Sequence, residues 1–165
     1  MIAGSLASTL HGEPRSTQDI DLVIDPTPEQ LTTFVDRLDK DRFYVGDAFG
    51  ALGRRDQFNV TDVTTGWKVD LIVRKDRPFS QTEFDRRQPA VILGVSTAVA
   101  SVEDTILAKL EWAKAGDSDR QRRDVTAMIS VQRATLDTDY LRHWAEALDL
   151  TPELDAALRS ADDDR

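Results

Sequence analysis

Apolar and polar residues alternate with a period of two in several stretches of the first hundred residues, which is typical of strands with one solvated face. Two such runs meet around Thr65-Gly66 and predict a β-hairpin, because a glycine between alternating segments favours a tight turn. The last of the strands is expected to kink at Gly94. The predicted β segments are 18–25, 43–47, 58–73 and 88–97.

In the other segments apolar residues recur every three or four positions, which predicts amphipathic helices. Thr27 and Pro28 suit the N-cap and first position of one helix. Ser101 with Asp104 forms a weak capping box at the start of another, which is expected to end at Gly116. The predicted helices are 5–10, 28–40, 101–116, 117–132, 137–150 and 151–161. The fold class is therefore α+β, a small mixed sheet flanked by helices and followed by a helical C-terminal half.

The chain has no internal repeat or low-complexity linker, so a single compact unit is expected. Within it, residues 1–100 form an α/β core and residues 101–160 form a helical part packed on that core. The acidic end, residues 161–165, is predicted to be a disordered and solvated tail.

Composition narrows the classes of function. The net charge of −9 argues against extended DNA binding, because phosphate neutralisation by basic side chains supplies most of that affinity. The absence of cysteine excludes disulfides and thiolate metal sites, and it makes a cytoplasmic location the default. No apolar run approaches the ~20 residues of a transmembrane helix, and the first residues lack a signal-peptide pattern, so no membrane partner is expected.

Three aspartates interrupt apolar strand sequences. Asp19 and Asp21 are two residues apart in one predicted strand, so their side chains share a face. Asp70 lies between Val69 and Leu71 in the second strand of the predicted hairpin. Neighbouring carboxylates repel, and a Mg²⁺ or Mn²⁺ ion removes that cost. The alternative is that Asp19 and Asp21 decorate a solvated face of the sheet.

Gly4 and Ser5 precede these aspartates at the start of a predicted helix. Backbone N–H groups at a helix start, together with a hydroxyl, can approach a phosphate closely. A phosphate cradle, a D-x-D pair and a third strand carboxylate together suit phosphoryl or nucleotidyl transfer assisted by metal ions.

This order of motifs resembles the nucleotidyltransferase superfamily of DNA polymerase beta, whose signature is a small-residue pair, D-x-D on a strand and a carboxylate on a later strand. The phrase HGEPRSTQDIDLVI is similar to a bacterial branch that includes abortive-infection toxins and many uncharacterised proteins. In that branch an arginine and a serine or threonine come shortly before D-x-D, as Arg15 and Thr17 do here. The resemblance implies that both help to bind the nucleotide phosphates. Arg15 could instead pin its loop by pairing with a strand aspartate.

The resemblance continues into the helical half, in the segment SVEDTILAKLEWAKAGDSDRQRRDV. It implies that Lys109 contacts nucleotide phosphates and that Asp124 completes the site or orients that lysine. The alternatives are a solvated helix lysine for Lys109, and for Asp124 an ion pair with Arg120 one turn earlier. Members of the superfamily usually have a helix and a strand before the Gly-Ser pair, whereas this chain begins three residues ahead of it. A truncated or late-assigned start is therefore expected.

The resulting hypothesis is a metal-dependent nucleotidyltransferase that moves a nucleoside monophosphate from a triphosphate to a hydroxyl. The acceptor could be a tRNA, a partner protein or a small molecule, and a toxin–antitoxin role is implied by the resemblance alone. Two alternatives stay open. One is a catalytically inactive member kept as a binding or partner-interaction module, and the other is a small-molecule enzyme of the antibiotic-modifying kind.

Overall fold

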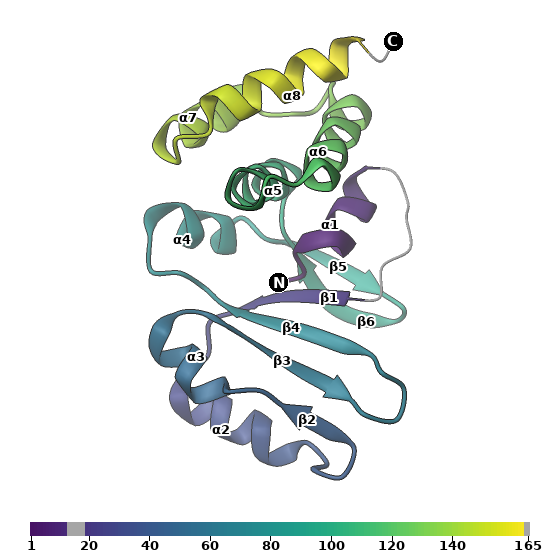
Figure 1. Cartoon of the computed structure of the whole chain (residues 1–165), viewed down its shortest axis with the longest axis vertical. Coiled ribbons are helices and arrows are strands. Elements are labelled where there is room, and N and C mark those ends of the chain that lie inside the picture. The colour runs from purple at the N-terminus through teal and green to yellow at the C-terminus, as the bar shows by residue number, and fades with distance from the viewer. Residues whose placement is uncertain (13–18, 164–165) are drawn as a thin grey trace. The chain divides into compact units, whose positions relative to one another are not determined.

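The computed structural model describes residues 1–12 and 19–163, which fall into two compact units. The first contains Met1–Ser5 and residues 19–99, and the second contains residues 6–12 and 100–163. Helix α1, Gly4–His11, begins in the first unit and continues in the second. The helices and strands of both units carry the labels of Figure 1.

The first unit is built on a four-stranded sheet in the order β1-β4-β3-β2 (Figure 1). Strands β1 and β4 run parallel, and the other neighbours are antiparallel. The predicted hairpin is confirmed, since β3 and β4 pair on either side of Thr65-Gly66. The strands are β1 Asp19–Ile24, β2 Phe43–Val45, β3 Gln57–Asp62 and β4 Lys68–Val73.

Two helices, α2 at Pro28–Arg37 and α3 at Ala48–Arg54, cover one face of this sheet. A buried cluster forms between them and the inward side chains of the strands, including Leu31, Phe58 and Leu71. Thr27 caps α2 as predicted, and the Gln30 side chain completes a reciprocal capping box. Helix α3 was not predicted, because two of its seven residues are glycine.

The segment expected to be one kinked strand is a hairpin of two strands, β5 Gln88–Ile92 and β6 Val95–Val99. The correction has a local cause. Leu93 and Gly94 both have positive φ, 51° and 80°, as in the two-residue turns that reverse a strand. A further helix, α4 at Pro78–Asp85, was also not predicted, although Pro78 occupies the usual first-turn position.

The first three residues join the two sheets of this unit. Ile2 makes β-bridges to Leu22 of β1 and to Val99 of β6, and its own side chain is buried. The amide of Ala3 donates to the carbonyl of Asp21, which fixes the chain immediately before Gly4. The position of Gly4 beside β1 is therefore set by backbone pairing.

The second unit is helical, and the predicted helices of the C-terminal half are confirmed. Ser101 caps α5 as expected. Helix α5 also ends at Gly116, but the residue with left-handed backbone is Asp117, with φ 47°. In this unit α5 packs against α6, α7 and α8. The helices are α5 Val102–Gly116, α6 Asp119–Gln132, α7 Thr138–Ala147 and α8 Thr151–Asp163.

Helix α8 continues to Asp163 and so includes part of the predicted disordered tail. The extension has a packing cause, since Ala161 is buried. Residues 164–165 lie outside the described part of the chain. Among the described residues, no helix combines the length and the apolar character that crossing a membrane requires.

Candidate functional site

The sheet brings the three predicted aspartates to one face. Asp21 of β1 and Asp70 of β4 are register partners on neighbouring parallel strands, and Asp19 lies two residues before Asp21. Register partners on neighbouring strands point to the same face of the sheet, so the three aspartates share a face. It is opposite the face that α2 and α3 cover. Asp19 is exposed, whereas Asp21 and Asp70 are half-buried. Such close carboxylates repel, so the arrangement requires a compensating positive charge.

Lys68 supplies such a charge, and the sequence analysis did not single it out. It is the register partner of Asp19, and its Nζ lies 2.9 Å from Oδ2 of Asp70 and 3.8 Å from Oδ1 of Asp19. The hydrogen bond to Asp70 raises the pKa of Lys68, against a smaller opposing effect of burial, and the charges of Asp70, Asp19 and Asp21 raise it further. The K-x-D spacing in β4 was the available signal, because residues two apart in a strand point the same way.

Gly4 and Ser5 lie against Asp21. The Ser5 N–H, at the start of α1, donates a long hydrogen bond of 3.4 Å to Oδ2 of Asp21. Gly4 has φ +57°, and a Cβ added to it would lie 1.9 Å from that same oxygen. A carboxylate therefore occupies the helix start, where N–H groups and the helix dipole favour negative charge. The predicted phosphate cradle and the D-x-D pair adjoin each other.

Gly4→Ala is expected to lower the free energy of unfolding by about 1–3 kcal/mol, because the new Cβ adds backbone strain and displaces the Asp21 carboxylate. Urea unfolding measures this loss. Adding Asp21→Ala should recover part of it, since that change removes the two atoms nearest the new Cβ.

Gly66→Ala is the matched control for this change. Gly66 also has positive φ, +75°, but a Cβ there would meet no atom within 4 Å. Its cost should therefore be backbone strain alone, about 1 kcal/mol. Equal losses for the two variants would show that the contact with Asp21 adds nothing.

Lys109 and Asp124 form an ion pair inside the second unit. Lys109 on α5 is 4% exposed, and its Nζ lies 2.8 Å from Oδ2 of Asp124 on α6. The amine also donates to Oε1 of Gln121 at 2.7 Å. The alternative of a solvated helix lysine is therefore wrong for Lys109. Asp124 forms an ion pair with Lys109, the lysine that the family resemblance implied it would orient.

Asp104, a fully buried acid, lies about one and a half turns before Lys109 on α5. The Oδ2 of Asp104 accepts a hydrogen bond from the Ser101 hydroxyl at 2.7 Å, and its Oδ1 accepts one from the Tyr140 hydroxyl at 2.5 Å. These bonds satisfy a carboxylate with no exposed surface and tie α5 to α7. Asp104 is thus a structural link between two helices.

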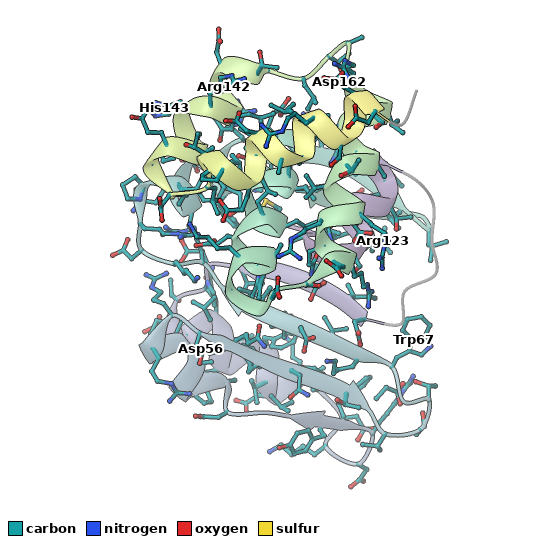
Figure 2. All side chains as sticks on the ribbon, turned by 45° about the horizontal axis from the view of Figure 1, so that its top comes forward. Asp56, Trp67, Arg123, Arg142, His143 and Asp162 are labelled. Atoms are coloured by element: carbon teal, nitrogen blue, oxygen red, sulfur yellow. The ribbon has the colours of Figure 1, made fainter. Side chains whose placement is uncertain are left out.

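Arg15 and Thr17, both predicted to contact phosphates, lie outside the described residues. His11, the last residue of α1, donates from Nε2 to the carbonyl of Ala100 at 2.7 Å. Trp67 is 51% exposed at the end of the β3–β4 hairpin, where its ring projects away from the ribbon (Figure 2). Trp112 of α5 is also exposed.

Oxygen donors on this face match the ligands that Mg²⁺ prefers. Such ions are commonly held by one or two carboxylates together with substrate phosphates, and Asp21 and Asp70 provide two on neighbouring strands. No group of three or more histidine, cysteine or acidic side chains within 1–12 and 19–163 is arranged to hold a metal ion by itself. Asp21 and Asp70 would therefore supply two oxygen ligands of such an ion, and a bound phosphate would have to supply others.

Comparison with models of known protein families finds no match, and comparison with curated proteins finds none either. A solved structure described as an antigenic nucleotidyltransferase-like protein from Paracoccidioides brasiliensis has a similar fold. The TM-score is 0.50, the sequences are 19% identical, and the match covers 96% of this chain and 83% of that one. The chain has a nucleotidyltransferase-like fold. At this identity the similarity concerns the fold and not the chemistry.

Proposed function

We propose that the chain transfers a nucleoside monophosphate from a nucleoside triphosphate to a hydroxyl acceptor. The observation that carries this proposal is the shared face of Asp19, Asp21 and Asp70, immediately beside the helix start at Gly4-Ser5. In this arrangement the carboxylates would bind the metal ion, and the adjacent helix start would bind the phosphates that the ion carries. The nucleotidyltransferase-like fold supports the same reaction class.

In this proposal the triphosphate lies near Gly4 and Ser5. Bound Mg²⁺ or Mn²⁺ would supply a Lewis acid that neutralises the phosphate charge. Asp19, Asp21 and Asp70 would hold the ion, and Asp70 would also accept the proton of the attacking hydroxyl. The acceptor oxygen bonds to the α-phosphorus, the bond to the bridging oxygen breaks, and pyrophosphate leaves.

Lys109 is proposed as a phosphate contact and Asp124 as the residue that orients it; the 2.8 Å ion pair supports the pairing of Asp124 with this lysine. Arg15 and Thr17 keep their proposed phosphate roles. The acceptor is proposed to be a tRNA end, a partner protein or a small molecule, and membership of a bacterial toxin branch with an antitoxin partner is part of the same proposal.

The test follows the α-phosphate and does not require the acceptor to be known beforehand. The purified chain is incubated with each α-labelled triphosphate, with Mg²⁺ or Mn²⁺, and with a total tRNA fraction, a protein fraction or small hydroxyl compounds in turn. Transfer of label to an acceptor, abolished by a chelator, is expected. Failure of every triphosphate and acceptor class, together with no binding of triphosphate in the presence of metal, would overturn the proposal.

A second candidate is a nucleotidyltransferase-fold module that binds a partner without catalysis. The observation that favours it is the pairing of Lys68 with Asp70 and Asp19, which compensates the carboxylates without a metal ion. The two candidates differ in one measurement, because a binding module releases no labelled pyrophosphate from a γ-labelled triphosphate under any metal condition.

A further inference from the structure

The Lys68 ammonium lies near the carboxylates of Asp70 and Asp19, where its positive charge reduces their mutual repulsion. Its ammonium contacts the Oδ2 of Asp70 and lies near the Oδ1 of Asp19, and Asp21 is the register partner of Asp70. The lysine side chain is 38% exposed and the Asp70 side chain 19% exposed. Water therefore reaches this pair, and the ammonium can leave Asp70 without entering an apolar space.

A divalent cation held by Asp70 competes directly with this ammonium. Both are positive, both take oxygen partners, and the Lys68 amine already uses one of the two Asp70 oxygens. Binding of a metal alone therefore loses an ion pair and places two cations side by side. When a polyphosphate arrives with the metal, it supplies new negative charge next to the released ammonium.

We propose that Lys68 is an internal counter-cation, which holds the carboxylates together in the metal-free protein and couples metal binding to triphosphate binding. This inference rests on the proposed function. The released ammonium pairs with a phosphate oxygen, so the metal and the nucleotide each strengthen the binding of the other. Lys68 is thus a positioning residue that favours the metal–triphosphate pair over free metal.

The first test measures Mn²⁺ binding by calorimetry to the full chain and to its Lys68→Met and Lys68→Arg variants. Each is titrated alone and with non-hydrolysable analogues of the four nucleoside triphosphates. Lys68→Met should bind Mn²⁺ alone about two- to five-fold more tightly than the wild type, because an exposed ion pair is worth up to about 1 kcal/mol. The analogue should also increase the Mn²⁺ affinity of Lys68→Met less than that of the wild type. Lys68→Arg, which keeps the charge, should behave like the wild type.

The outcomes separate the two proposals. Equal Mn²⁺ affinity and equal gain from the analogue in the wild type and Lys68→Met would overturn the role of Lys68 and leave the proposed function standing. Failure of the wild type to bind Mn²⁺, with or without an analogue, would overturn both the metal-dependent function and the coupling.

A second test needs no metal. In a chelator at low salt, Lys68→Met should lower the melting temperature by about 2–4 °C, and high salt should reduce the difference. Lys40→Met, an exposed lysine of the same unit, is the matched control and should cause no loss. A metal-free Lys68→Met variant as stable as the wild type would overturn the counter-cation role.

Discussion

Asp19→Asn combined with Asp21→Asn is expected to reduce label transfer by about 10³-fold or more, while the chain stays folded. In the proposed reaction the two carboxylates would hold the metal ion that neutralises the phosphate charge, a contribution of several kcal/mol in the transition state, and each 1.4 kcal/mol corresponds to about ten-fold in rate. Asparagine keeps the size of each side chain and removes the negative charge to which the proposal assigns metal binding. The measurement is the initial rate of label transfer, with circular dichroism as the check on folding.

Asp36→Asn is the matched control for this pair. Asp36 is an exposed aspartate on α2, the helix that covers the opposite face of the same sheet. This variant should keep the full rate. Unchanged transfer in the double variant would mean that the reaction does not use the carboxylates of β1.

Lys109→Met is expected to destabilise the second unit by about 3–5 kcal/mol. The change removes the ammonium that lies 2.8 Å from the Asp124 carboxylate, in an ion pair whose side chains are only 4% and 13% exposed. Urea unfolding measures the loss directly. Replacing both partners, as in Lys109→Met with Asp124→Leu, should recover most of it, because two apolar side chains leave no buried charge behind.

The same helix provides the control. Lys114 also lies on α5 and pairs with an aspartate, Asp149, but this lysine side chain is 40% exposed and the Asp149 side chain is almost fully exposed. Lys114→Met should therefore cause a much smaller loss, because solvent screens an exposed pair. Equal losses for the two lysines would show that burial of the Lys109 pair adds nothing to stability.

The parts of the fold that sequence predicted are those with a strong period. Strands β1, β3 and β4 show clear alternation, and helices α5 to α8 show regular apolar spacing with recognisable caps. Helix α3 was missed because it is short and contains Gly50 and Gly53. The β5–β6 turn was missed because Leu93 occupies a left-handed position that glycine, asparagine or aspartate usually fills.

For the site, the features set within one strand were predictable from the sequence, and those that depend on pairing between distant segments were not. The shared face of Asp19 and Asp21 follows from strand geometry, and the structure adds that Asp70 is the register partner of Asp21. The K-x-D spacing could have indicated the pairing of Lys68 with Asp70, whereas the pairing of Lys68 with Asp19 and the contact of Gly4 with Asp21 depend on which strand or helix lies beside β1. Pairing between segments about fifty residues apart leaves no periodic pattern in the sequence.

The parallel register of β1 and β4 limits how this sequence can vary. Side chains of a strand alternate between faces, so inserting one residue between Lys68 and Asp70 would turn one of them toward the face covered by α2 and α3. Substitutions at Ile20 or Val69 that preserve volume leave the polar face unchanged. A search for chains with the same arrangement should therefore treat the spacings D-x-D and K-x-D as fixed and the intervening letters as free.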